Sequence, residues 1–232
     1  MDVGVTLEPV LPEEVKPRAQ STQAKAKQTW QSPEKAADYR ASRDPSRFKR
    51  YERENEVVSH WLADLGRGAW VLDLPCGTGR FIPLLDSRGF RYVGGDFSQA
   101  MIREAMKTAG DKPTVGFVNA DLEFIPFRDE SVDCVIIWRF LHHIDKDSVR
   151  QAMLREAARV SRYKVILSFY HPFSFTHWRQ LFQQRFLGRR GANAVSHRKL
   201  QAEAAACGLR TVGMEGVRKY VSINWFACFE KV

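Results

Sequence analysis

The chain has 232 residues, of which 44% are hydrophobic and 27% are charged, a composition typical of a globular domain with a full core. No apolar run approaches the roughly 18 residues of a membrane span, and the N-terminus has no apolar stretch typical of a secretory signal. We therefore expect a cytoplasmic protein with no transmembrane segment. Its net charge of +9 indicates either an anionic partner, such as RNA, or simply a basic solvated surface.

The first predicted segment is a flexible tail at residues 1–33, which is polar and contains several prolines. A single domain is predicted for residues 34–232, and Ser32-Pro33 resembles the start of a short helix. A second helical pattern runs from about Ser46 to Leu65. Four cysteines follow without a C-x-x-C pair, so we expect free thiols in a reducing compartment and no metal site.

Strand and helix patterns then alternate along the chain. The strands are predicted at Trp70–Leu74, Tyr92–Asp96, Val115–Asp121, Val132–Trp138 and Lys164–Tyr170. The helices are predicted at Gly79–Ser87, Gln99–Thr108, Asp145–Arg162 and His197–Cys207, and a closing pair of strands at Arg210–Val217 and Ile223–Glu230. This order predicts an α/β protein with an open, mostly parallel sheet and helices on both faces. Ligands of such sheets bind beyond the carboxyl ends of the strands.

A tight turn of small residues follows the first predicted strand. Gly77 and Gly79 would let a ligand approach the backbone closely, and the following helix would present free N–H groups. Asp73, at the start of the turn, would repel a pyrophosphate. The turn therefore predicts a site for a ligand with cationic or polar groups.

Each of the next two predicted strands also ends in an acid, Asp96 and Asp121. A carboxylate at Asp96 can accept hydrogen bonds from both hydroxyls of a ribose. Asp121 can accept a hydrogen bond from an exocyclic amine, with Met101 and Leu122 on the two sides of the ring. Asp73 can order the turn or attract an ammonium group. These residue types together predict a pocket for a nucleoside that carries an amino-acid tail.

Four stretches resemble the motifs of the class I S-adenosylmethionine-dependent methyltransferase family, over about Val57 to Leu167. They are Leu72–Gly79, Val93–Met101, Asn119–Phe127, and Ser131–Ile136 continuing to Leu141–Ile144. The resemblance implies a Rossmann-like three-layer αβα sandwich with a seven-stranded, mostly parallel sheet whose last strand is antiparallel. It also implies S-adenosylmethionine as methyl donor. Pro75 departs from the usual glycine; it fixes φ and lacks an N–H, so backbone donors must come from residues 76–79.

The expected cofactor-binding residues form one set around the strand ends. They are Asp73, Pro75, Cys76, Gly77, Gly79, Asp96, Phe97, Met101, Asp121, Leu122 and Trp138. A dinucleotide-binding dehydrogenase is disfavoured because Ile82 stands where its fingerprint has a third glycine. Residues 138–141 lack the Asn/Asp-Pro-Pro-aromatic motif, so methylation of an amino group on a base is disfavoured as well.

The methyl acceptor is less closely defined. Candidate bases after the fourth and fifth strands are His143, His171 and Tyr170, with His142 and His177 beside them. An insertion at about 171–195 is rich in aromatic residues and arginine and predicts a lid over the site. The leading hypothesis is methyl transfer to O, N or C of a small or lipid-like molecule, which could be anionic. The alternatives are an RNA-modifying methyltransferase and a non-catalytic cofactor-binding partner subunit.

Overall fold

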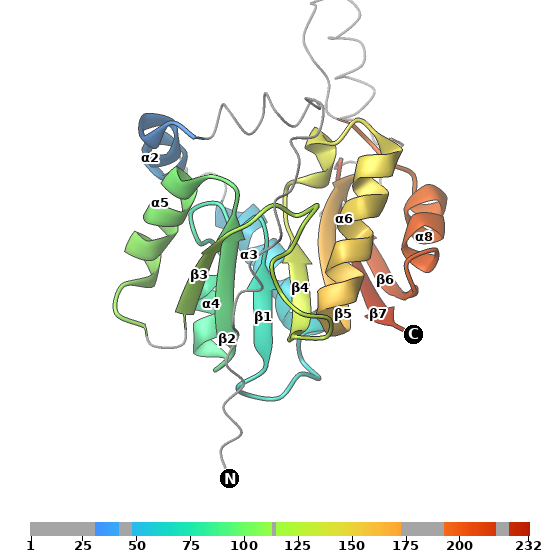
Figure 1. Ribbon diagram of the computed structural model, residues 1–232, viewed down its shortest axis with the longest axis horizontal. Helices are drawn as coiled ribbons and strands as arrows, with labels where there is room; N and C mark the ends of the chain where they lie inside the picture. The colour runs from blue at the N-terminus through green and yellow to red at the C-terminus, as the bar shows by residue number, and fades with distance from the viewer. Residues whose placement is uncertain (1–30, 42–47, 113–114, 173–192, 217–222) are drawn as a thin grey trace, which may run out of the picture.

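The computed structural model describes residues 31–41, 48–112, 115–172, 193–216 and 223–232 (Figure 1). The predicted tail lies almost wholly outside these ranges, and so does most of the predicted lid, residues 173–192. The tail and the lid therefore stay predictions. The helix predicted at Ser32-Pro33 is present as α2, Pro33–Ala41, and packs against α5 through Ala36.

A seven-stranded sheet forms the centre of the molecule, in the order β3-β2-β1-β4-β5-β7-β6. Its strands are β1 Trp70–Asp73, β2 Arg91–Asp96, β3 Val115–Asn119, β4 Val132–Ile137, β5 Ser161–Tyr170, β6 Leu209–Gly216 and β7 Asn224–Lys231. The first five pair in parallel, and β7 runs antiparallel to both β5 and β6. The predicted sheet, with its antiparallel last strand, is confirmed. Because β1 is central, its end lies between those of β2 and β4.

Helices cover both faces of the sheet (Figure 1). One face packs against α3 Phe48–Trp61, α4 Ile82–Ser87 and α5 Gln99–Ala109. The other packs against α6 Asp147–Val160 and α8 His197–Ala205, while a 3-10 turn, η2 Leu141–His143, follows β4. Val71 and Leu72 show why β1 is apolar throughout, since these neighbours are fully buried on opposite faces. The three-layer αβα prediction is therefore confirmed.

Several element boundaries differ from the predicted ones, and three of the differences have a local reason. Helix α4 begins at Ile82 because Gly79 has a φ of +73°, which is not helical. Strand β5 begins at Ser161, directly after α6, so Arg162 is in the strand and pairs with Asp133. Strand β3 ends at Asn119, two residues before Asp121.

Candidate functional site at the carboxyl edge of the sheet

The glycine turn leaves β1 at the carboxyl edge of the sheet. The Leu74–Pro75 peptide is cis, and the N–H of Cys76 donates to the carbonyl of Gly95 at 2.7 Å. Gly77 has a φ of +54°, and a Cβ placed there would meet nothing within 4 Å. Gly79 differs, because a Cβ there would clash with Ile82 and lie 3.2 Å from the Cα of Ala105. One glycine thus opens the turn to a ligand, and the other lets it pack on α5.

Asp96 connects the end of β2 to this turn. Its Oδ2 accepts a hydrogen bond from the N–H of Gly77 at 2.9 Å, and its Oδ1 accepts one from the N–H of Ser98 at 2.8 Å. Burial raises the pKa of Asp96 to about 6, and the two backbone donors oppose that rise. A carboxylate oxygen can accept more than one hydrogen bond. Asp96 therefore has acceptor capacity left for the hydroxyls of a ribose.

Asp73 is 1% exposed and lies beneath the turn. Its Oδ2 accepts a hydrogen bond from the hydroxyl of Tyr92 at 3.0 Å, whereas its Oδ1 has no hydrogen-bond partner in the structure. Burial raises the pKa of Asp73 to about 7, which outweighs the opposing effects of Tyr92 and Arg80. A buried carboxylate oxygen without a partner is costly. It is the kind of group that a cationic ligand would satisfy.

The third acid is not at a strand end as predicted, because β3 stops at Asn119. Asp121 lies in the following loop, where its Oδ1 accepts a hydrogen bond from the N–H of Glu123 at 3.2 Å. Asn119 instead occupies the strand end and donates from Nδ2 to the carbonyls of Asp96 at 2.8 Å and Phe97 at 2.9 Å. Asn119 was not predicted as a site residue, although side-chain amides of Asn commonly hydrogen-bond to nearby backbone groups.

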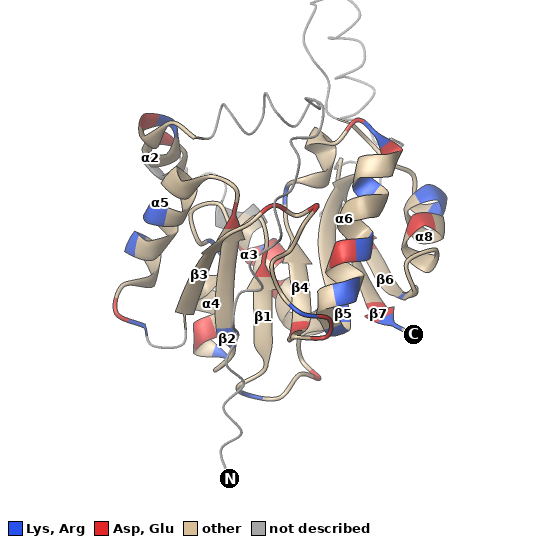
Figure 2. Ribbon diagram, viewed as in Figure 1, with Lys and Arg blue, Asp and Glu red and all other residues tan. Residues whose placement is uncertain are grey.

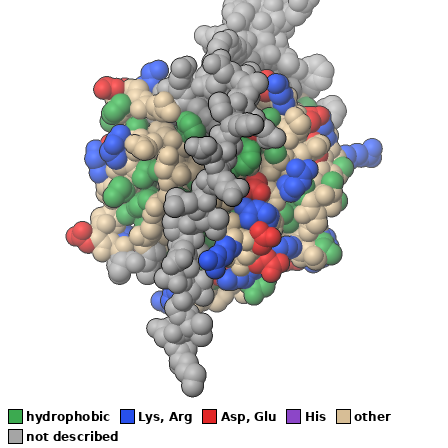
Figure 3. All heavy atoms as spheres, viewed as in Figure 1, with side chains coloured by type: hydrophobic (Ala, Val, Ile, Leu, Met, Phe, Trp, Pro, Cys, Tyr) green, Lys and Arg blue, Asp and Glu red, His purple; other side chains and the backbone are tan. Residues whose placement is uncertain are grey.

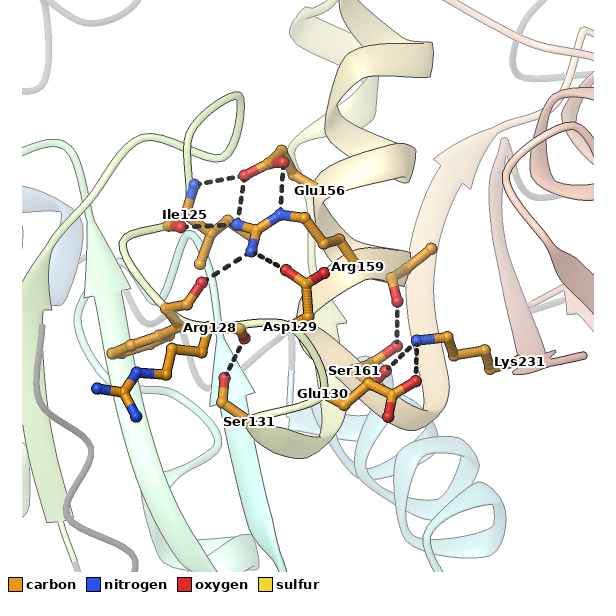
Figure 4. Close-up of polar contacts among 11 residues, drawn as sticks. Ile125, Arg128, Asp129, Glu130, Ser131, Glu156, Arg159, Ser161 and Lys231 are labelled. Atoms are coloured by element: carbon orange, nitrogen blue, oxygen red, sulfur yellow. Dashed lines mark hydrogen bonds and ion pairs between the residues drawn. The ribbon is translucent and has the colours of Figure 1, made fainter. Parts of the chain in front are cut away.

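The loop that carries Asp121 is tied to α6 further along its course (Figure 4). The guanidinium of Arg159 donates to the carbonyls of Ile125 at 3.0 Å and Phe127 at 2.9 Å, and to Asp129 at 2.7 Å. Glu156 accepts from the N–H of Ile125 at 3.0 Å and also pairs with Arg159. Side chains of α6 therefore hold the far part of this loop in place.

The remaining predicted cofactor residues are placed in different surroundings. Met101 is buried beside Ala36 and Ala100, whereas Leu122 belongs to the larger core under α6. Phe97 is 38% exposed at the end of β2, and the Cys76 side chain is buried. Trp138 is buried; its ring stacks on Phe226 with centroids 4.8 Å apart. The structure does not place Met101 and Leu122 in one cluster.

A buried ionic cluster adjoins the turn. Glu54 of α3 is 1% exposed and pairs with Arg80, which follows the glycine turn, and with Arg139, which follows β4. It also accepts from Nε1 of Trp138 at 3.2 Å. Burial opposes ionisation of Glu54, but the two guanidinium groups outweigh it and hold its pKa below the usual value. The predicted site residues did not include Glu54, Arg80 or Arg139.

The predicted catalytic candidates separate into two groups of rings. His142 stacks on Tyr170 with centroids 4.2 Å apart and an interplanar angle of 6°, and the exposed His143 lies 4.0 Å from His142. His171 faces His197 and Trp225 instead, with centroid distances of 4.1 and 5.4 Å. Burial, followed by His143 and Arg139, lowers the pKa of His142 to about 3, so this ring is neutral near pH 7. His177 lies outside the described ranges.

These features lie on the edge of the sheet where α/β proteins bind nucleotide cofactors. A glycine turn, two buried acids at the ends of β1 and β2, and an acidic loop after β3 define a nucleotide-cofactor-binding protein of the Rossmann-like class. Asp73, at the end of β1 directly before the turn, stands where a pyrophosphate would need a neutral or positive group. The site therefore favours a nucleoside with a cationic tail over a dinucleotide.

Residues 71–164 match a family model described as a methyltransferase domain. This stretch is therefore a methyltransferase domain of the class I type, whose methyl donor is S-adenosylmethionine. The fold resembles the magnesium protoporphyrin IX methyltransferase of Synechocystis PCC 6803 with bound S-adenosylhomocysteine, with a TM-score of 0.76 and 18% identity over 90% of this chain and 100% of that one.

Curated relatives match a shorter stretch. A demethylmenaquinone methyltransferase of Clavibacter sepedonicus is 37% identical over 98 residues, 38% of this chain and 40% of that protein. A tRNA (carboxymethyluridine(34)-5-O)-methyltransferase of Arabidopsis thaliana is 33% identical over 103 residues, 44% of this chain and 24% of that protein. This chain thus spans less than half the length of either relative.

Two further findings concern membranes and metals. Within the described ranges, no helix combines the length and apolar character needed to cross a bilayer. The His, Cys, Asp and Glu side chains of the same ranges form no group of three that could hold a metal ion. The four cysteines are free thiols, and Cys76, Cys134 and Cys228 are buried.

Proposed function

We propose that this protein transfers a methyl group from S-adenosylmethionine to O, N or C of a small or lipid-like acceptor. The observation that carries the proposal is the pair of buried acids, Asp73 and Asp96, on either side of the open turn at Gly77. Asp96 would bind the ribose hydroxyls and the partnerless Oδ1 of Asp73 would receive the ammonium group. Asp121 would accept from the adenine amine.

When bound, the cofactor supplies a methyl group on a positively charged sulfur, which is transferred by direct displacement. For such a reaction, positioning provides much of the rate enhancement. The role of Asp73, Asp96 and Asp121 would therefore be to bind and orient the donor. The acceptor would approach from the side of β4 and β5, because β2 and β3 flank β1 on the nucleoside side.

On the face shown in Figure 3, the mixed charges of the described residues favour a small acceptor over RNA. Residues 173–192 include four arginines and no acid, so part of the net charge of +9 falls outside the described ranges. In Figure 2, α6 and α8 each carry both signs of charge, and Figure 3 shows acidic and basic side chains interspersed on the face in view. An RNA-binding surface would need a basic stripe. RNA stays the second candidate because the tRNA methyltransferase of Arabidopsis is among the relatives.

Radiolabel transfer tests this proposal. The protein is incubated with S-adenosylmethionine carrying a tritiated methyl group and with a heat-treated cell extract, in which other methyltransferases are inactive. We expect label in the small molecules extracted by organic solvent, and none with the Asp96→Ala variant. Label that stays with RNA and is released by ribonuclease would favour the second candidate. Cofactor binding without any labelled product would indicate a non-catalytic subunit.

We also propose a cytoplasmic location.

A further inference from the structure

Arg139 occupies an unusual position at the end of β4. Its φ is +52°, a left-handed conformation that non-glycine residues seldom adopt. Its N–H donates to Oγ of Ser168 on β5 at 2.6 Å, which helps to hold the backbone there. The side chain reaches back to Glu54, with Nη2 at 2.9 and 3.0 Å from the two carboxylate oxygens. The chain thus bends sharply to place a guanidinium at the carboxyl edge.

The positive charge of Arg139 is only partly compensated. Glu54 is shared with Arg80, so one carboxylate faces two guanidinium groups, and both lie over the ring of Tyr51 at 5.0 and 4.7 Å. Buried charges need a full complement of opposite charge. Glu54 engages only Nη2 of Arg139 and the Tyr51 side chain accepts a further hydrogen bond, whereas a guanidinium carries five N–H donors on three nitrogens. The Arg139 side chain is 20% exposed, so a ligand can reach it.

Among the described residues, those that follow Arg139 toward the acceptor side include uncharged aromatic rings. Phe140 follows it, and the stacked rings of His142 and Tyr170 lie beyond, with His142 neutral near pH 7. Arg139 is close enough to His142 to contribute to the lowered pKa of that ring. A cationic group beside flat, uncharged rings suits a ligand with an anionic group on a planar apolar body.

We propose that Arg139 is a specificity-determining residue that binds a carboxylate of the methyl acceptor, whose planar body lies toward His142 and Tyr170. This inference rests on the proposed function and names the acceptor as a planar, apolar carboxylic acid. The carboxylate of the cofactor's amino-acid tail has the same chemistry. The position of Arg139 after β4, rather than in the turn after β1, favours the acceptor.

The test uses 2-naphthoate as the probe and 2-naphthamide as its neutral counterpart, both with S-adenosylhomocysteine present. Binding is followed by the NMR signal of the Nε–H of Arg139 and by titration calorimetry. We expect 2-naphthoate to shift the Arg139 signal and 2-naphthamide to leave it in place. Arg139→Met should weaken 2-naphthoate binding at least about tenfold. The Glu54–Arg80 pair stays intact in that variant, so it should fold, and its thermal transition is recorded to verify this.

Arg162→Met is the matched control, because Arg162 pairs with Asp133 at the opposite edge of the sheet. It should leave 2-naphthoate affinity unchanged. Equal affinity of wild type and Arg139→Met for 2-naphthoate, or no binding of the probe, would overturn the proposal. A loss of S-adenosylhomocysteine affinity with 2-naphthoate binding unchanged would assign Arg139 to the cofactor instead. Failure of methyl transfer with normal 2-naphthoate binding would count against the proposed function alone.

Discussion

Replacing Glu54 by Ala should lower the free energy of unfolding by about 3–5 kcal/mol, because the substitution leaves two neighbouring guanidinium groups without their shared carboxylate. Arg80 and Arg139 would then repel each other in a largely buried space. Trp138 would lose the acceptor of its indole N–H as well. Urea unfolding followed by circular dichroism measures the loss.

Glu52→Ala is the control for this prediction, since Glu52 lies on the same helix but is exposed. A surface change of this kind should alter the free energy of unfolding by less than about 0.5 kcal/mol. If Glu54→Ala is no more destabilising than Glu52→Ala, Glu54 does not hold α3 against the strand ends.

Asp73→Asn should make the stability of the free protein less sensitive to pH. Burial raises the pKa of Asp73 from 3.8 to about 7, so folding favours the protonated form. The contribution of Asp73 is therefore complete below about pH 4 and is lost as the pH rises through 7. Asn cannot ionise, yet its side-chain oxygen can still accept from Tyr92. The free energy of unfolding of the variant relative to wild type should rise by about 3 kcal/mol between pH 4.5 and pH 8.

Urea unfolding of both proteins at several pH values measures this difference. The contributions of the other acids to the free energy of unfolding cancel in the comparison, because these acids are the same in both proteins. Asp111→Asn, an exposed residue after α5, should show no such trend. A difference between Asp73→Asn and wild type that stays constant across this range would show that Asp73 ionises normally in the folded protein.

Much of the fold could be predicted, because short apolar runs indicate buried strands and apolar residues at helical spacing indicate helices. Ser98 is the N-cap of α5, a position that favours serine, and it accepts a hydrogen bond from the N–H of Met101 at 3.1 Å. The end of β3 was misplaced because Asp121 belongs to a loop held by distant contacts, with Ile125 bonded to Glu156 of α6. Periodicity carries no information on such contacts.

The ionic cluster shows what was overlooked in the sequence. Glu54 precedes Val57 and Val58 by three and four residues, so it shares their buried helix face, and a charged residue there indicates a paired partner. Its partners could not be predicted, because Arg80 and Arg139 are 26 and 85 residues away along the chain. The separation of Tyr170 from His171 follows from the alternation of side chains along a strand.

Calorimetric titration with S-adenosylmethionine tests the central claim most directly, with Asp96→Ala as the variant and Asp111→Ala as the control. We expect saturable binding at one site in the wild type and in Asp111→Ala. Asp96→Ala should lose at least about 100-fold in affinity, because two charge-assisted hydrogen bonds to the ribose would disappear. Circular dichroism would verify that the variant is folded. Absence of binding to the wild type, or equal affinity in a folded Asp96→Ala, would contradict the assignment of this edge as the cofactor site.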